Sequence, residues 1–358
     1  MEQKLNTSGR IYDLDVLRTL ACCAVVMIHA SAQYASNDVG TLNFFIGNFW
    51  DSLSRFAVPV FVMISGALLL DEDHIYSAEK NKRRILRMVR FFVFWSLVYC
   101  VGFQLVLPVL KHEPFDLPLF LRSFFSGSFH LWFCYMIVGL YLILPLLRLW
   151  VKRENVRQVR YFIFLAFLFS AVLPLAAGCG AKLPGLPGQL FGSMKSILSN
   201  LGLEYVGGYT AFFLLGWYLR FYEVKRKKLL HAAGIAATVI LYAAICAGSL
   251  YYSDFFNLYK NETMFVFLQA AAVFVFVKDR CRRSERTPSQ CVASVSRCSL
   301  GIYAMHVAVL TFMSRPVRWL SITNAALAIP FLFVTTFGVS WALSALLGRM
   351  RWTRPFVE

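Results

Sequence analysis

The stretch DLDVLRTLACCAVVMIHASA (13–32) places an arginine and a histidine inside a segment that is otherwise almost entirely apolar. Nine of the ten residues between Arg18 and His29 are apolar, and the tenth is a threonine. Such a run is typical of a membrane-spanning helix, in which ionisable side chains are costly and face a protein interior or a watery cavity. Eleven residues of helix make about three full turns, so both side chains lie on one face, about 16 Å apart along the axis. The segment therefore predicts a membrane helix with one polar face.

The composition extends this interpretation to the whole chain. Of the 358 residues, 58% are hydrophobic and 15% are charged, which is typical of a polytopic membrane protein. We expect an all-α fold with ten membrane-spanning helices, at 13–35, 45–70, 89–110, 129–150, 159–177, 204–222, 229–252, 262–278, 297–314 and 323–348. The connections between them are too short for a further domain. We therefore expect one transmembrane domain over 13–348, tails at 1–12 and 349–358, and no cleavable signal.

The net charge of +17 has a topological explanation. Lysine and arginine concentrate in the two tails and in every second connection between the expected spans, with few in the alternate connections. This alternation follows the positive-inside rule and predicts that both termini are cytoplasmic. It accounts for the basic excess without nucleic acid as a partner. A second role of these charges, in attracting an anionic substrate or membrane lipid headgroups, stays open.

Neither cysteines nor histidines form a recognisable metal or disulfide pattern. Most of the nine cysteines fall in or beside expected spans, and their spacing does not match a zinc site. We therefore expect no metal.

Two interpretations stay open for each of the polar residues in the first span. Arg18 either anchors the helix at the cytoplasmic interface, paired with Asp15 one turn earlier, or binds a ligand. His29 lies too deep to reach the interface. It either bonds a neighbouring helix or acts as a base, because its pKa is ordinarily near neutrality.

The second span carries Arg55 at about the depth of His29. A guanidinium there needs a carbonyl, a carboxylate or a substrate oxyanion, and Asp51 one turn earlier is the structural alternative. Pro59 and the pair Ser65-Gly66 predict breaks in this helix, where the chain approaches a ligand closely.

Two further spans contribute candidates. In the ninth span His306 lies near the centre with Tyr303 on the same face, as part of a polar chamber or of helix packing. The fourth span begins with His130 and Trp132 at the outer interface, where an aromatic belt is the default expectation.

Four stretches together resemble the acyltransferase-3 family of integral membrane acyltransferases. They are LDVLRTLACCAVVMIHASA (14–32), RFAVPVFVMISGALLL (55–70), HLWFCYMIVGLYLILPLLR (130–148) and SLGIYAMHVAVL (299–310). The chain is most similar to the subgroup that O-acetylates surface polysaccharides such as the enterobacterial common antigen. The resemblance implies a multi-pass protein of the bacterial cytoplasmic membrane that transfers an acetyl group from acetyl-CoA to a glycan hydroxyl, the glycan being surface-exposed or lipid-linked. Some relatives carry a hydrolase-like outer domain, and we expect this chain to act without one.

Carried over residue by residue, the resemblance makes His29 and Arg55 the catalytic candidates. It makes Arg18, Tyr303 and His306 the candidates for binding acetyl-CoA or the acceptor, and to these we add Asp15, one turn before Arg18, and His130, at the start of the fourth span. His29 either activates the hydroxyl for direct attack or carries the acyl group itself. The rival interpretation is a carrier or exporter that uses the same polar chamber. The acceptor sugar, the length of the acyl chain and homo-oligomer formation stay open.

Overall fold

The computed structural model describes residues 11–36, 38–73, 75–283, 289–319 and 322–357. Every regular element in these residues is a helix, so the chain is an all-α polytopic membrane protein. Eight described helical stretches are long and apolar enough to cross a membrane: Tyr12–Ser36, Leu42–Leu69, Ala78–Leu110, Leu117–Trp150, Arg153–Gly180, Lys227–Gly248, Gln290–Val317 and Ala325–Leu347. The expected spans 204–222 and 262–278 are also helical but do not belong to these eight, so the count of ten stays a prediction.

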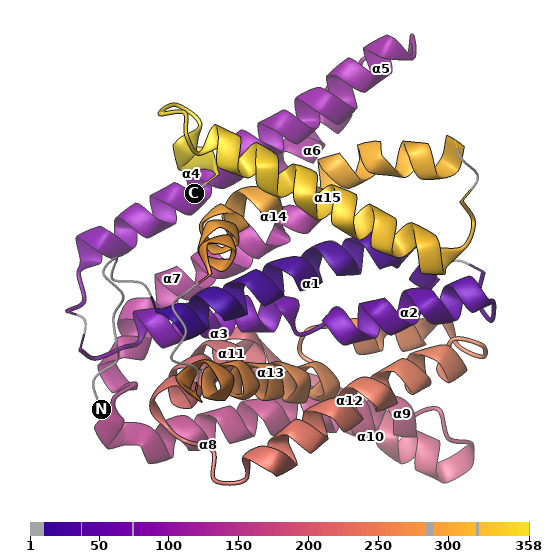
Figure 1. Ribbon diagram of the computed structural model, residues 1–358. Coiled ribbons are helices and arrows are strands. Elements are labelled where there is room, and N and C mark those ends of the chain that lie inside the picture. Colours follow the sequence, from indigo (N-terminus) through magenta and orange to yellow (C-terminus); the bar gives the residue numbers. More distant parts are fainter. Residues whose placement is uncertain (1–10, 37, 74, 284–288, 320–321, 358) are drawn as a thin grey trace.

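The helices follow one another in this order (Figure 1): α1 Tyr12–Ser36, α2 Leu42–Ser54, α3 Ala57–Leu69, α4 Ala78–Cys100, η1 Val101–Val106, α5 Leu107–Leu110, α6 Leu117–Ser126, η2 Phe129–Leu131, α7 Trp132–Trp150, η3 Arg153–Asn155, α8 Val156–Phe167, η4 Leu168–Val172, α9 Leu173–Gly180, α10 Gly185–Leu201, α11 Leu203–Phe221, α12 Lys227–Gly248, η5 Ser253–Tyr259, α13 Met264–Arg283, α14 Gln290–Trp319, α15 Ala325–Leu347 and η6 Arg354–Phe356.

Helix α1 occupies the middle of the bundle, with α14 and α15 on one side of it and α3 and α13 on the other (Figure 1). It packs against α2, α3, α13, α14 and α15. Because α1 is surrounded, its polar face looks at other helices instead of lipid. This position explains how the first span carries ionisable side chains within an apolar sequence.

The second expected span is two helices, α2 and α3, which meet at Arg55 and Phe56. The breaks predicted at Pro59 and at Ser65-Gly66 are wrong, because α3 runs without interruption through all three residues. Pro59 lies in the first turn of α3, where a missing backbone N–H costs nothing. The break instead places Arg55 at the C-terminal end of α2.

Close packing between α3 and α11 explains the glycine of the Ser65-Gly66 pair. A Cβ on Gly66 would lie 1.8 Å from the backbone oxygen of Phe213, and a Cβ on Gly216 would lie 1.9 Å from that of Met63. The two backbones therefore touch at both glycines. Small residues at helix interfaces are the usual device for such contact in membranes, where van der Waals packing drives helix association.

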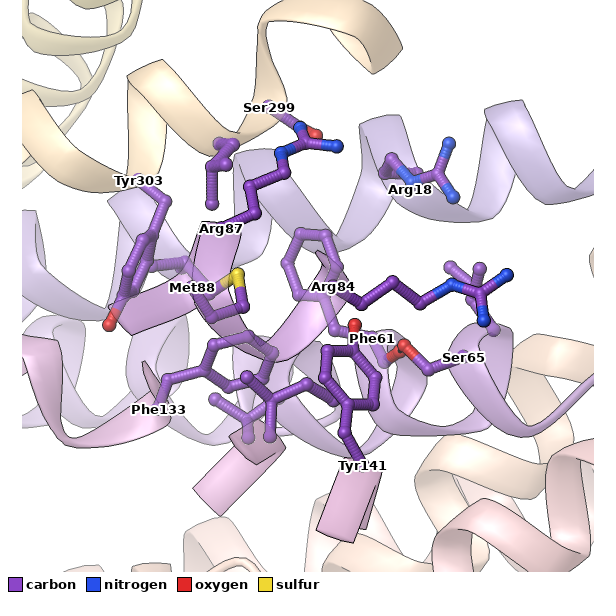
Figure 2. Close-up of a pocket in the computed structure, with 15 residues that line it drawn as sticks. Arg18, Phe61, Ser65, Arg84, Arg87, Met88, Phe133, Tyr141, Ser299 and Tyr303 are labelled. Atoms are coloured by element: carbon purple, nitrogen blue, oxygen red, sulfur yellow. The ribbon is translucent and has the colours of Figure 1, made fainter. Parts of the chain in front are cut away.

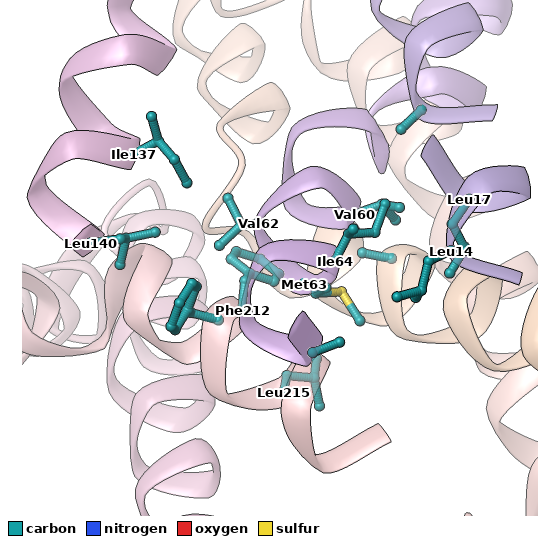
Figure 3. Close-up of a cluster of buried hydrophobic side chains, with 14 of the residues drawn as sticks. Leu14, Leu17, Val60, Val62, Met63, Ile64, Ile137, Leu140, Phe212 and Leu215 are labelled. Carbon is teal, nitrogen blue, oxygen red and sulfur yellow. The ribbon is translucent and has the colours of Figure 1, made fainter. Parts of the chain in front are cut away.

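Around this contact lies the main apolar cluster, which joins α1, α3, α7 and α11 (Figure 3). Phe212 and Trp217 of α11 are almost completely buried, as are Met63 and Ile64 of α3. Helix α11 is thus enclosed by the bundle along much of its length. The cluster fixes α3 against α1 and so sets the position of the residues that line the polar face of α1.

Three observed helices differ from the expected spans and connections, and all three are polar or amphipathic in part. Helix α4 begins eleven residues before the expected span, because the basic stretch that precedes it consists of good helix formers capped by Ser77. The expected connections 111–128 and 178–203 contain α6 and α10, which are short and amphipathic. Asp116 caps α6 by accepting a hydrogen bond from the backbone N–H of Leu119 at 2.9 Å.

Residues of the predicted C-terminal tail fold back onto the bundle. The indole of Trp95 in α4 donates a hydrogen bond to the carbonyl oxygen of Phe356 at 2.8 Å, and Phe356 stacks on Phe94. On the other side, the N–H of Gly301 in α14 donates to the carbonyl oxygen of Val357 at 3.0 Å. Residues 356–357 therefore connect α4 to α14.

Candidate functional site

Three histidines from separate elements meet inside the bundle. His29 comes from α1, His130 from η2 and His306 from α14. The ring centroids of His29 and His306 are 4.9 Å apart, and those of His130 and His306 are 5.3 Å apart. The structure thus brings together all three histidines that the sequence analysis selected. Within the described residues, no group of three or more His, Cys, Asp and Glu side chains is arranged to hold a metal ion.

Two of these imidazoles are held through one ring nitrogen each. His306 Nδ1 lies 2.6 Å from the carbonyl oxygen of Tyr303, and His130 Nε2 lies 3.3 Å from that of Ala304. A carbonyl only accepts, so each of these nitrogens carries the proton in a neutral ring. The remaining nitrogens, His306 Nε2 and His130 Nδ1, are buried and have no partner among the described residues. Both rings therefore direct a lone pair into the space between the helices.

His29 differs from the other two. It makes ring contacts with His306 and Phe129, yet forms no hydrogen bond with any described side chain or backbone group. Its side chain is only half-buried. The alternative in which His29 serves to bond a neighbouring helix is therefore not what the described residues show. An imidazole in this setting is available to a substrate.

Tyrosines from two helices organise the surroundings of the histidines. The hydroxyl of Tyr303 donates to the backbone carbonyl of His130 and so links α14 to η2. The hydroxyl of Tyr99, in α4, donates to the carbonyl oxygen of Ala304 at 2.8 Å and accepts from the N–H of Ala308 at 3.2 Å. Ala304 and Ala308 are four residues apart, so Tyr99 stands in the backbone ladder of α14 beside His306. Sequence analysis missed Tyr99, because a tyrosine in an apolar span carries no distinguishing signal.

A cavity of about 220 Å³ lies alongside the polar face of α1 (Figure 2). Three arginines, Arg18, Arg84 and Arg87, line one end of it, and Tyr303 and Phe133 line the other. The hydroxyl of Tyr141 lies within the electrostatic reach of all three guanidinium groups. The remaining lining residues are Val25, Val58, Phe61, Ile64, Ser65, Met88, Ile137, Ser299 and Leu300.

Arg18 has a structural contact and also faces the cavity. Its Nη1 donates to Asp15 at 3.4 Å and to the hydroxyl of Ser296 at 3.2 Å, and this hydroxyl donates to Asp15 at 2.6 Å. The predicted pairing with Asp15 is therefore present. The same guanidinium lines the cavity, so both interpretations of Arg18 have a structural counterpart. Asp15 itself is buried and does not line the cavity.

Arg84 and Arg87 are the residues that sequence analysis did not select. Neither has a carboxylate partner among the described residues, whereas the adjacent Arg83 points outward and pairs with Glu79 at 3.0 Å. The sequence shows all of these cations as one basic run, which the positive-inside rule explains without a ligand. The helical spacing of Arg84, Arg87 and Met88 was the available signal, because residues three and four apart share a helix face.

Arg55 is held in place by the structural partner that the sequence named. Its Nη2 donates to Asp51 at 2.5 Å, its Nη1 donates to the carbonyl oxygen of Tyr259 at 3.2 Å, and its guanidinium lies over the Tyr259 ring at 4.0 Å. Arg55 Nε is buried and has no partner among the described residues. The charge of Arg55 also lies within electrostatic reach of the His29 ring. The group is thus rigidly oriented near the histidine cluster.

Tyr303 connects the cavity to the histidine cluster. Its ring lines the cavity and lies 5.7 Å from the ring of His130 and 6.1 Å from that of His306. His29 is not among the residues that line the cavity. The arrangement is a passage with three cations at one end and imidazole lone pairs beyond the aromatic side chains at the other. Such a site suits an anionic molecule whose reactive end reaches a base.

Comparison with protein families gives one match, to the family described as "Acyltransferase domain" (Acyl_transf_3), over residues 11–345. The match includes every residue of the histidine cluster and of the cavity. Comparison with curated proteins and with solved structures found no match. The chain therefore belongs to the acyltransferase-3 family and is a membrane acyltransferase.

Proposed function

We propose that this protein transfers an acetyl group from cytoplasmic acetyl-CoA to a hydroxyl of a cell-envelope glycan, either a surface polysaccharide or its lipid-linked precursor, in a bacterial cytoplasmic membrane. One observation carries the proposal. A single cavity begins at Arg18, Arg84 and Arg87 and ends at Tyr303, which contacts the histidine cluster. An exporter of polar solutes needs a polar path across the bundle, but it does not need a cavity with cations at one end and, at the other, a tyrosine in ring contact with histidines.

The arginine end suits the phosphate groups of CoA. Guanidinium groups present planar pairs of donors that match phosphate oxygens, and charge-assisted hydrogen bonds are about twice as strong as neutral ones. Arg84 and Arg87 have no carboxylate partner among the described residues. A phosphate group therefore binds them without displacing a carboxylate side chain. The basic connection that precedes them is the one that the positive-inside rule assigns to the cytoplasm, where acetyl-CoA is found. The apolar walls beyond them suit the pantetheine arm.

The histidine end supplies the base. In the proposed step His29 removes the proton of the acceptor hydroxyl, and the oxygen attacks the thioester carbonyl to give a tetrahedral oxyanion. The C–S bond then breaks, and the CoA thiolate takes the proton from the His29 imidazolium. His130 and His306 are each bonded to a backbone carbonyl through one ring nitrogen, and the other ring nitrogen of each is buried without a partner among the described residues. Arg55, oriented by Asp51 and Tyr259, is placed to stabilise the oxyanion with its charge.

A transfer assay with purified protein tests the proposal. The donor is [14C]acetyl-CoA, and the acceptor is the glycolipid fraction extracted from cells that lack this chain and that therefore contain unmodified acceptor. We expect wild type to label the glycolipid and release CoA thiol in equal amounts. His29→Ala should lower the rate by about 10²- to 10⁴-fold, the usual effect of losing a general base.

The matched control is His231→Ala, because His231 lies on α12 and contacts Phe276, outside the histidine cluster. This variant should transfer acetyl at the wild-type rate. Wild-type protein that binds acetyl-CoA but releases no CoA thiol would overturn the proposal and favour the exporter. Full activity in His29→Ala would remove His29 from the mechanism.

A further inference from the structure

Aromatic side chains at the start of α7 mark a second approach to His29. Phe129 contacts the His29 ring at 5.5 Å between centroids, yet 67% of Phe129 is exposed. Tyr141, which lies among the cavity arginines, follows Phe129 by twelve residues, or about 18 Å of helix. Phe129, in η2 directly before α7, is therefore on the side of α7 away from the arginines. The histidine cluster borders an exposed surface on the side opposite the proposed donor end.

This exposed surface continues along α7 and across to α11. Trp132, one turn after Phe129, is 38% exposed and its ring lies 5.7 Å from that of Tyr209. Tyr209 follows Gly208, where α11 departs from helical geometry (φ 13°, ψ −130°), so Tyr209 lies directly after a kink in the helix. Two helices thus contribute a pair of adjacent, partly exposed aromatic rings, one of them a turn along the chain from Phe129, which contacts His29.

Polar groups border these rings. The side-chain amide of Asn261 donates a hydrogen bond to the Tyr209 hydroxyl at 3.0 Å, and the carboxylate of Glu262, the next residue, interacts electrostatically with the same hydroxyl. Both residues are half-buried and belong to the connection between η5 and α13. An aromatic belt at a membrane interface needs no carboxylate and no amide. The combination of rings, carboxylate and amide is the chemistry of a ligand with both apolar and hydroxyl surfaces.

A hexopyranose has this pair of surfaces. Its axial C–H groups form an apolar face that packs on an aromatic ring, while its equatorial hydroxyls donate to carboxylates and exchange hydrogen bonds with amides. Tryptophan and tyrosine give such contacts at low entropic cost because they have few rotatable bonds. The carboxylate of Glu262 repels a ring that carries its own carboxylate, so uronic acids are poor ligands here.

We propose that Phe129, Trp132, Tyr209, Asn261 and Glu262 form the surface that binds an uncharged hexopyranose ring of the acceptor. The inference rests on the proposed acetyl transfer and assigns the acceptor its position relative to His29. The sugar packs on Trp132 and Tyr209, Glu262 and Asn261 bind its hydroxyls, and Phe129 borders the opening toward His29. The donor and the acceptor then reach His29 from opposite sides.

Kinetics of two Trp132 variants and one Glu262 variant test this surface, with the same glycolipid fraction and [14C]acetyl-CoA as substrates. Trp132→Ala should raise the half-saturating amount of glycolipid about 10-fold, the effect of losing one well-packed ring contact. Acetyl-CoA affinity and the maximal rate should stay within about twofold. Trp132→Phe keeps a ring and should recover most of the loss. Glu262→Gln should also raise the half-saturating amount, without affecting acetyl-CoA binding.

Trp319→Ala is the matched control, because Trp319 is 84% exposed and lies at the end of α14, in a connection expected on the same side of the membrane. Trp319→Ala should have the same half-saturating amount of glycolipid, maximal rate and acetyl-CoA affinity as wild type. The inference is overturned if Trp132→Ala and Glu262→Gln both behave like Trp319→Ala. It is also overturned if they weaken acetyl-CoA binding as much as glycolipid use, which indicates general loss of structure. Wild-type protein that transfers no acetyl contradicts the proposed function itself, and the assignment of this surface to an acceptor falls with it.

Discussion

At the scale of single residues, Arg18 shows how one side chain serves structure and binding together. A guanidinium has five N–H donors, and the contacts with Asp15 and Ser296 both use Nη1. The side chain is 28% exposed and lines the cavity. The ion pair with Asp15 therefore orients the guanidinium without removing it from the cavity.

Replacing Arg18 by lysine separates the two roles. A lysine side chain reaches the membrane interface as well as an arginine does. If Arg18 is only an anchor, Arg18→Lys therefore has little effect on acetyl-CoA binding. An ammonium lacks the planar fork, and the loss of charge-assisted hydrogen bonds is worth about 1.5–3 kcal/mol, or roughly 10- to 150-fold in affinity. We expect Arg18→Lys to weaken acetyl-CoA binding at least severalfold, measured by calorimetry at fixed ionic strength. Unchanged affinity would leave Arg18 as an anchor.

Arg84 and Arg87 allow a comparison within one helix. Arg84→Ala and Arg87→Ala should each weaken acetyl-CoA binding severalfold and reduce its dependence on salt, because each removes a cation from the cavity. Arg83→Ala removes the same charge from the outward face, where Arg83 is 75% exposed and paired with Glu79, and should have little effect. Equal losses in all three variants would show that only the total charge of the basic run matters.

At the scale of elements, a side chain from α4 binds the backbone of α14 beside His306. The Tyr99 hydroxyl donates to the carbonyl oxygen of Ala304 and accepts from the N–H of Ala308, within one turn of α14. The same carbonyl oxygen accepts from His130. One hydroxyl therefore takes part in the placement of two imidazoles.

Tyr99→Phe tests this positioning role. The phenylalanine keeps the ring that packs against His130 and Phe103, but it removes the hydroxyl that bonds the backbone groups of Ala304 and Ala308. We expect the rate of acetyl transfer to fall about 10-fold or more and its pH profile to shift, while acetyl-CoA affinity stays unchanged. Phe103→Leu, in the neighbouring η1, is the control for ring packing alone. A wild-type rate and pH profile in Tyr99→Phe would contradict the role.

The sequence predicts the elements well where they are long and apolar, and poorly where they are short or charged. Helices α1, α7 and α15 occupy the expected ranges, because a continuous apolar run admits no other structure in a membrane. Helices α6 and α10 were missed, since their length and amphipathic pattern resemble an ordinary connection. The break at Arg55 was misplaced to the proline because tertiary packing, not local propensity, decides where this chain turns.

At the scale of the whole molecule, the histidine cluster was predictable in its members but not in its contacts. An ionisable residue in an apolar span is conspicuous, so His29 and His306 stand out in the sequence. Their separation of 4.9 Å depends on how α1 packs against α14, which no local pattern encodes. The cavity was beyond prediction for the same reason, because its cations come from α1 and α4, which are distant in sequence.

The number of spans depends on α11 and α13. If both cross the membrane, reporter fusions after residues 190 and 257 report the outside, and fusions after residues 225 and 290 report the cytoplasm. We expect this result, because the basic connections 220–229 and 278–297 follow the two helices. The same side for 190 and 225 would show that α11 does not cross. Reporters after residues 257 and 290 on the same side of the membrane would show that α13 does not cross.

The central claim is that acetyl-CoA enters at the arginine end and reacts beyond Tyr303 with a glycan from the opposite side. Sealed membrane vesicles of both orientations, supplied externally with [14C]acetyl-CoA, test it most directly, since the charged donor does not cross the bilayer unaided. Inside-out vesicles, which expose the cytoplasmic face, should label the glycan, and the same vesicles with His29→Ala should not. Right-side-out vesicles should remain unlabelled. Equal labelling in both orientations, or undiminished labelling with His29→Ala, would contradict the claim.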